Sequence, residues 1–129
     1  MKSKSFICAE EIILNSFTNS ISAINIFENL AADRFPVVIP KIMWLNLIER
    51  AASEPEKKEL YLVIYIDETE IHRMTLNAEF KSGTLTKNVA IVTNLSIPRA
   101  GIFRAVCRDG KEVLSSHDFK IEQVQKNGI

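Results

Sequence analysis

The stretch PRAGIFRAVCRDGKEVLSSHDFKIEQV, residues 98–124, indicates two β-strands joined by a tight turn. Asp109-Gly110 lies between two runs rich in apolar and β-branched residues, and glycine adopts a positive φ without steric penalty. Successive side chains point to opposite faces of a strand, so Phe103 and Cys107 share one face, and two arginines mark the other face as the wetter one. The sequence therefore predicts a β-hairpin with Cys107 facing the core.

The same hairpin bears on whether Cys107 is a reactive thiol. With Asp109-Gly110 as the turn, Cys107 would face Glu112 and His117 would face Ile102. At about 3.3 Å per residue, Cys107 and His117 would then lie roughly 15 Å apart, too far for proton transfer. A polar stretch ending at His117 interrupts the alternation and predicts a bulge. A free cysteine in a core behaves as a small hydrophobe, so Cys107 is interpreted as structural.

The rest of the chain consists of similar short runs separated by turn signals, which is typical of an all-β domain. We expect one domain over residues 1–129, an all-β, two-sheet, antiparallel immunoglobulin-like sandwich of seven or eight strands. Trp44 is expected between the sheets. The segment RFPVVIP is predicted to be a crossover, because its two prolines block regular pairing. The predicted strands before the last hairpin are residues 6–14, 21–30, 42–49, 60–66, 71–80 and 88–95.

One segment, IMWLNLIERAASEPEKKE, is open to a second interpretation as an amphipathic helix that stops near Pro55. Its apolar residues do not form a clean helical stripe, however. A strand followed by a charged loop agrees better with its strand-rich neighbours.

Composition restricts the classes of partner. Sixteen basic and sixteen acidic residues cancel in this chain of 129 residues, so no global field attracts nucleic acid or an anionic membrane. No secretion signal or membrane-spanning run is recognisable, which predicts a cytoplasmic protein. Its two cysteines, Cys8 and Cys107, are then expected to be reduced, which argues against a disulfide between them.

Motifs for catalysis or cofactors do not occur in the sequence. There is no glycine-rich phosphate loop, no Gly-x-Ser-x-Gly elbow, and no Cys-x-x-Cys or paired-histidine zinc pattern. No cofactor is therefore expected, and the sequence favours a protein that is not an enzyme.

Two groups of residues are candidates for a site. Tyr61, Val63 and Tyr65 form one face of the run LYLVIYI, which is apolar on both faces. The outer face of a sandwich normally meets water, so this face could bind a protein partner or a second copy as a homodimer; a neighbouring loop could equally cover it.

The second group lies in the turn IDETEIH. Asp67, Glu68, Glu70 and His72 could ligate a divalent metal, although their spacing matches no known ligand pattern. A solvated hairpin tip is the plainer interpretation. A third hypothesis is that an acidic loop docks on a membrane with calcium.

The sequence resembles a bacterial family of small cytoplasmic β-sandwich domains of unknown function. The resemblance rests on the opening FICAEEIILNSFTNSISAINIFENL, on FPVVIPKI, and on LSIPRAGIFRAVCRDGKEV near the end. Ala100-Gly101 stands where Pro-Gly is expected, a small departure. The resemblance implies a cytoplasmic sandwich and supplies no catalytic residues.

These observations favour a non-catalytic binding or assembly module that acts through strand faces or edges. The alternative is a small ligand-binding or metal-binding domain, or an enzyme, that uses the Asp67–His72 turn.

Overall fold

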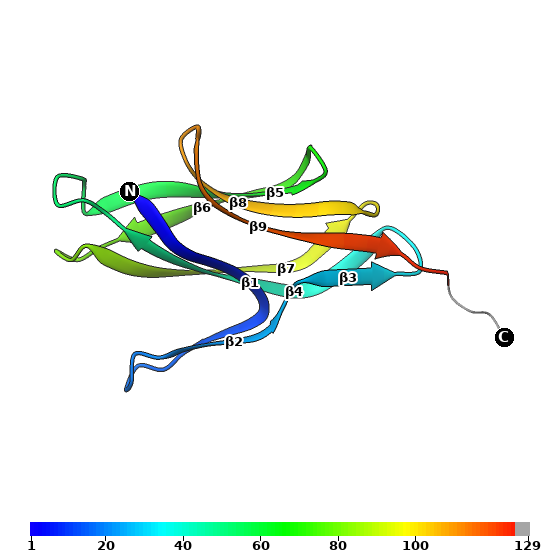
Figure 1. The fold of residues 1–129 in the computed structure, drawn as a ribbon, viewed down its shortest axis with the longest axis horizontal. Helices are drawn as coiled ribbons and strands as arrows, with labels where there is room; N and C mark the ends of the chain where they lie inside the picture. Colours follow the sequence, from blue (N-terminus) through cyan, green and yellow to red (C-terminus); the bar gives the residue numbers. More distant parts are fainter. Residues whose placement is uncertain (126–129) are drawn as a thin grey trace.

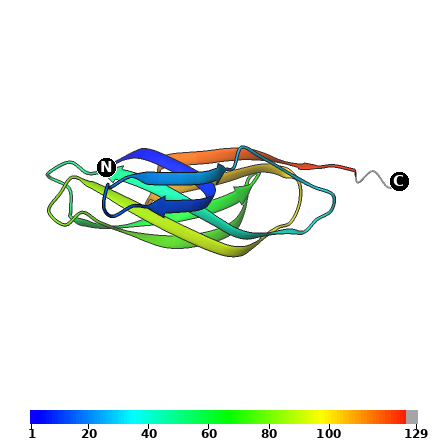
Figure 2. The ribbon, with the colours of Figure 1, turned by 90° about the horizontal axis from the view of Figure 1, so that it is seen from below.

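The structure, a computed structural model that describes residues 1–125, contains nine strands in two stacked sheets (Figures 1 and 2). The predicted all-β, two-sheet fold is confirmed. Sheet A has the strand order β2 (Ile21–Ile26), β1 (Lys2–Leu14), β4 (Val37–Glu49) and β7 (Leu85–Ile97). Sheet B has the order β3 (Asn29–Ala32), β9 (Glu112–Gln123), β8 (Gly101–Asp109), β5 (Lys57–Ile66) and β6 (Thr69–Glu79).

The core lies between the sheets and follows from the period-two alternation of the strands. Trp44 of β4 is 1% exposed and packs there as predicted. Every second residue of β5 from Leu60 to Ile66 is fully buried in the same core. The rings of Phe103 and Phe119, on neighbouring strands, stack with their centroids 4.4 Å apart. Strands with branched and aromatic residues on one face therefore bury that face against the opposite sheet.

Three sequence predictions differ from the observed fold. The predicted strand 21–30 is two strands in different sheets, β2 and β3, so there are nine strands where seven or eight were expected. Asn25 has a φ of 56°, at the end of β2. The predicted crossover 34–40 also differs, because β4 already begins at Val37 and runs through Pro40. Finally, β3 pairs parallel to β9, so the sheets are not wholly antiparallel.

The last hairpin exists as predicted, but its register was wrong. Asp109 pairs with Glu112, and a register shift between Cys107 and Arg108 makes Cys107 pair with Ser115. His117 consequently pairs with Ala105 rather than with Ile102. Gly110, with φ of 59°, lies in the two-residue turn. Two of the three residues of this difference in register come from the turn, which is Gly110-Lys111 rather than Asp109-Gly110, and the bulge adds the third.

His117 of β9 connects the two sheets at the side where β1 passes β9. Its Nδ1 accepts a hydrogen bond from the Cys8 amide at 3.4 Å, and its Nε2 lies 2.6 Å from the Phe27 carbonyl oxygen. The imidazole serves both groups as the neutral tautomer with its proton on Nε2. The ring of Phe27 also stacks on Phe119, with centroids 5.5 Å apart. The His117 side chain thus hydrogen-bonds one backbone group of β1 and one of the residue that follows β2.

We expect His117→Phe to lower the free energy of unfolding by about 1–3 kcal/mol, because it leaves the Cys8 amide and the Phe27 carbonyl without partners. Denaturant titration followed by tryptophan fluorescence measures the loss. His72→Phe is the matched control: no side-chain hydrogen bond of His72 is found within residues 1–125, and we expect a change within about 0.5 kcal/mol. Equal losses in the two variants would contradict the bridging role.

Candidate functional site

β1 changes its pairing partner halfway along its length, and this change opens a hollow beside β4. β1 pairs with β4 as far as Ala9, opposite Met43, and from Ala9 onward it pairs with β2. β4 nevertheless stays paired with β7 back to Val37. Residues 37–42 of β4 are therefore paired on one side only, and the other side faces the gap that β1 leaves.

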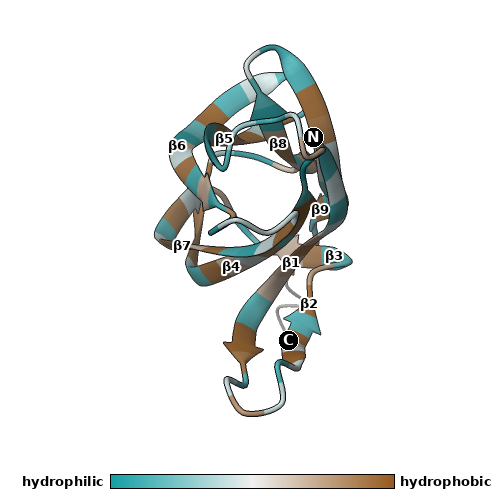
Figure 3. Ribbon diagram, turned by 90° about the vertical axis from the view of Figure 1, so that its left-hand side faces the viewer, coloured by the Kyte–Doolittle hydropathy of each residue, from teal (hydrophilic) through white to brown (hydrophobic). Residues whose placement is uncertain are grey.

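The second half of β1 and β2 form a hairpin, residues 10–26, which we call the arm. The arm leaves the sandwich below β1 and β4 (Figure 3) and turns back along sheet A (Figure 1). At its root, Ala9 and Ile12 pack with Leu45 in a small apolar cluster on the outer side of sheet A. Near its tip, the Asn19 carbonyl accepts a hydrogen bond from Lys87 Nζ at 3.0 Å. These contacts hold the arm apart from the first half of β4.

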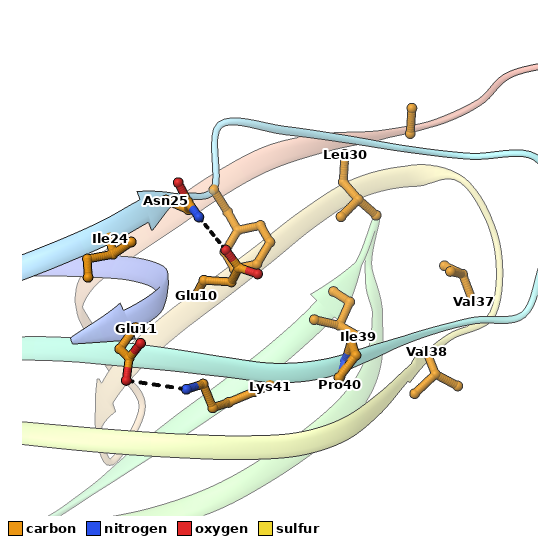
Figure 4. A pocket seen from close by; sticks show the side chains of 12 residues that line it. Glu10, Glu11, Ile24, Asn25, Leu30, Val37, Val38, Ile39, Pro40 and Lys41 are labelled. Carbon is orange, nitrogen blue, oxygen red and sulfur yellow. Dashed lines mark hydrogen bonds and ion pairs between the residues drawn. The ribbon is translucent and has the colours of Figure 1, made fainter.

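A cleft of about 450 Å³ occupies the gap between the root of the arm, β3 and the first half of β4 (Figure 4). Most of its lining is apolar. Ile24 and Val38 are 42% and 52% exposed, so apolar surface is available to a ligand. The complete lining is Glu10, Glu11, Ile24, Asn25, Phe27, Leu30, Ala31, Val37, Val38, Ile39, Pro40 and Lys41.

The polar residues of the cleft gather at the end next to the arm. Lys41 Nζ lies 3.6 Å from Glu11 Oε1, and Asn25 donates a hydrogen bond to Glu10 (Figure 4). Two carboxylates against one ammonium leave this end with a small negative excess. Pro40, which has no N–H, lies on the half-paired segment of β4, where a missing donor is tolerated. The arrangement suits an extended chain that brings apolar side chains and carries little acidic charge.

The predicted interface residues lie on the outer face of sheet B. Val63 is fully buried, and its neighbour Val106 on β8 is 3% exposed. Tyr61 donates a hydrogen bond to the Glu59 carboxylate at 2.6 Å, which raises the pKa of Tyr61. Tyr65 accepts one from a neighbouring arginine. The side chains of the sheet itself cover Val63, and whether the two tyrosines contact a partner stays a prediction.

The predicted metal residues do not converge. Asp67 Oδ1 accepts a hydrogen bond from the Ile102 amide at 3.0 Å, and Asp67 Oδ2 lies 3.3 Å from Arg99. Glu70 instead pairs with Arg73 at 2.8 Å, and this hydrogen bond lowers the pKa of the Glu70 carboxyl. Across residues 1–125, no group of three or more histidine, cysteine or acidic side chains is placed to hold a metal ion.

The four residues also do not share a pocket. Asp67 and Glu68 line a small hollow on the outer face of sheet B, whereas Glu70 and His72 are not part of its lining. The turn is thus held by arginines and by a backbone amide, which is a structural arrangement.

The two thiols lie in the core, and both are fully buried. Burial raises the pKa of Cys107 to about 11, even though Asn46 donates a hydrogen bond to its Sγ at 3.0 Å. Burial also raises the pKa of Cys8 far above its usual range. His117 does contact the Cys8 backbone, a proximity that the sequence could not show, but both of its ring nitrogens are engaged with backbone groups. No base is therefore free to activate either thiol at this place.

The sequence interpretation missed the cleft. It placed residues 34–40 outside the sheets and so could not recognise half-paired backbone there. One signal was present: Pro40-Lys41 interrupts a β-branched run, and proline and lysine are typical of strand edges. The contribution of Ile24 and Asn25 from the arm had no sequence signal, because it depends on where β1 leaves β4.

Fold and site together define a two-sheet β-sandwich with a cleft beside a half-paired strand. The chain belongs to a family of unknown function (DUF6941), which matches residues 4–128. The expected resemblance to a family of unknown function is thereby confirmed. A comparison with curated proteins finds no match. Over the described residues, no helix is long and apolar enough to cross a membrane.

We expect Gly101→Ala to destabilise the fold by about 1–3 kcal/mol. Gly101 has a φ of 154°, and an added Cβ would lie 2.7 Å from Asp67 Oδ2. The Asp67 side chain cannot move away from the added Cβ without losing the hydrogen bonds that it accepts from the Ile102 amide and from Arg99. A double-mutant cycle with Asp67→Ala, measured by denaturant unfolding, separates clash from backbone strain. If the losses in the free energy of unfolding are strictly additive, the two positions are not coupled, and the expected clash between the added Cβ and Asp67 does not occur.

The thiols give a second prediction. A pKa near 11 against an ordinary thiol pKa of 9.0 leaves on the order of 100-fold less thiolate at neutral pH, so we expect labelling of Cys107 to be slower in the native protein by at least that factor. The labelling rate of both cysteines is measured by absorbance, as a disulfide reagent releases its coloured thiol, in native and in denatured protein. Fast release of one equivalent of the coloured thiol from the native protein would show a reactive cysteine and so contradict the assignment of both thiols to the core.

Proposed function

We propose that this protein is a non-catalytic binding module that holds an extended segment of a partner protein in the cleft. The observation that carries the proposal is the half-paired backbone of β4, residues 37–42, bordering an apolar hollow. An unpaired strand offers amides and carbonyls that a second chain can meet by adding a strand. The apolar lining would then select side chains on alternate positions of that chain.

The dimensions of the cleft support this occupant. About 450 Å³ lies in the range of sites that accept a few side chains. Glu10 and Glu11 with the single cation Lys41 favour a segment that is neutral or slightly basic. Pro40 limits pairing to the residues on either side of it. We therefore expect a short strand with apolar side chains, held mainly by their burial.

The lack of catalysis is also part of the proposal. Its support is that His117 uses both ring nitrogens structurally and that both thiols are buried. The bacterial origin and the cytoplasmic location, which the resemblance implies, belong to the proposal as well. Two free, buried cysteines agree with a reducing compartment. A second copy of this chain is one form that the partner can take.

The test is a selection of short random peptides displayed on phage, followed by affinity measurement with the synthetic peptides. We expect Val38→Glu and Ile24→Glu to weaken binding at least about tenfold, because each puts a charge into the apolar surface. Ile102→Glu is the matched control: Ile102 is 44% exposed on β8, comparable with Ile24 on the arm. Hydrogen exchange should show protection, on binding, of the amides in residues 37–42 other than Pro40, which has no N–H.

Three outcomes would overturn the proposal. The first is that no selected peptide binds, and the second is that the control variant weakens binding as much as the cleft variants. The third is protection that falls elsewhere than on residues 37–42. Light scattering over a range of concentrations tests self-association separately: a dimer that Val38→Glu dissociates identifies a second copy as the occupant, whereas a dimer that Tyr65→Ala dissociates would move the interface to sheet B.

A further inference from the structure

A second hollow, on the outer face of sheet B, carries arginines. It measures about 290 Å³ and lies over β5, β8 and β9, on the sheet opposite to that which forms most of the cleft. Arg104, Val106 and Arg108 occupy alternate positions of β8, so two guanidinium groups line the same hollow on either side of a valine. Tyr65 and Ser116 add hydroxyl groups to the lining.

The two arginines have different partners. Arg104 lies 3.3 Å from the Asp118 carboxylate, so its charge is paired. Arg108 has no ion pair within residues 1–125: its Nη2 donates a hydrogen bond to the Tyr65 hydroxyl at 3.0 Å, and its guanidinium lies 5.9 Å from the centroid of the tyrosine ring. The neighbouring carboxylate, Asp109, pairs with Lys58 at 3.2 Å instead.

Arg108 is also incompletely hydrogen-bonded. Its Nε is buried and has no partner in the described part of the chain. A guanidinium stays charged at any ordinary pH and has five N–H donors, and its planar fork matches two oxygens of a carboxylate or of a phosphate. The Nε itself is inaccessible, but the Nη atoms donate to only one neutral hydroxyl, so their remaining N–H groups and the charge are available to an acceptor from outside.

Two carboxylates at the rim limit the kind of acceptor. Asp67 belongs to the lining, but Arg99 and the Ile102 amide engage it. Glu68, which also lines the hollow, would repel a large polyanion. The size of the hollow and this rim favour a single small oxyanion over an extended polyphosphate.

We propose that this hollow binds one carboxylate or phosphate group, held by Arg108 and Arg104 with the hydroxyls of Tyr65 and Ser116. The site is independent of the cleft, because it lies on the other sheet and shares none of its residues. The ligand is a free small anion, whose oxygens accept hydrogen bonds from Arg108.

The test follows the arginine Nε–H signals of the full chain by NMR during titrations with acetate and with inorganic phosphate at constant ionic strength. We expect the Nε–H chemical shift of Arg108 to change and to saturate with added anion. Comparing the two titrations shows whether the hollow prefers a carboxylate or a phosphate. Arg108→Gln should weaken binding about tenfold or more. Arg108→Lys keeps the charge but not the paired N–H groups of the guanidinium, so it should lose less affinity. Arg73→Gln is the matched control on the same sheet, because Arg73 is paired with Glu70.

Sodium chloride at the same ionic strength shows whether the shifts are only a general salt effect. Shifts that chloride reproduces would overturn the proposal, as would an Arg73→Gln variant that binds as weakly as Arg108→Gln. Binding that survives in Arg108→Gln, while its spectrum shows an intact fold, would equally exclude Arg108 as the anchor. None of these results bears on the cleft, which peptide binding tests.

Discussion

The feature on which much of this structure depends is that β1 pairs with β4 along one edge only as far as Ala9, and with β2 along its other edge from Ala9 onward. Its first half completes sheet A next to β4, and its second half turns away to form the arm with β2. Ala9, Ile12 and Leu45 are all buried where the change occurs, so apolar packing holds the branch point. The half-paired segment of β4, the cleft beside it and the placing of the arm all follow from this one departure.

The residues with the most reactive chemistry serve the structure. His117 hydrogen-bonds two backbone groups, the Cys8 amide of β1 and the carbonyl of Phe27, the residue after β2. Asp67 accepts a hydrogen bond from the Ile102 amide near the start of β8, and Gly101 makes room for it. Cys8 and Cys107 fill core positions. His117 and Asp67 thus provide hydrogen-bond partners for backbone groups, as close-packed backbone requires.

The two sheets present different surfaces to a partner. Sheet A, with the arm, offers apolar side chains and half-paired backbone, which suit a polypeptide segment. Sheet B covers its central valines, Val63 and Val106, with tyrosine and arginine side chains, whose long stems bury apolar surface while their heads remain polar. This division explains why a run that is apolar on both faces, LYLVIYI, can be central in a sheet without leaving an apolar patch around Val63.

The sequence by itself determined the all-β class, most of the strands, the core positions of Trp44 and Cys107, and the last hairpin, because alternation and turn residues are local signals. Only the tertiary structure decided that residues 21–32 divide between two sheets, that β4 continues through Pro40, and that the position of the last turn together with a bulge pairs His117 with Ala105. The candidate site was not predictable for the same reason. A strand edge is half-paired, or a guanidinium lacks an ion pair, only because no other strand or carboxylate lies beside it. Which groups lie side by side depends on contacts between residues far apart in the chain.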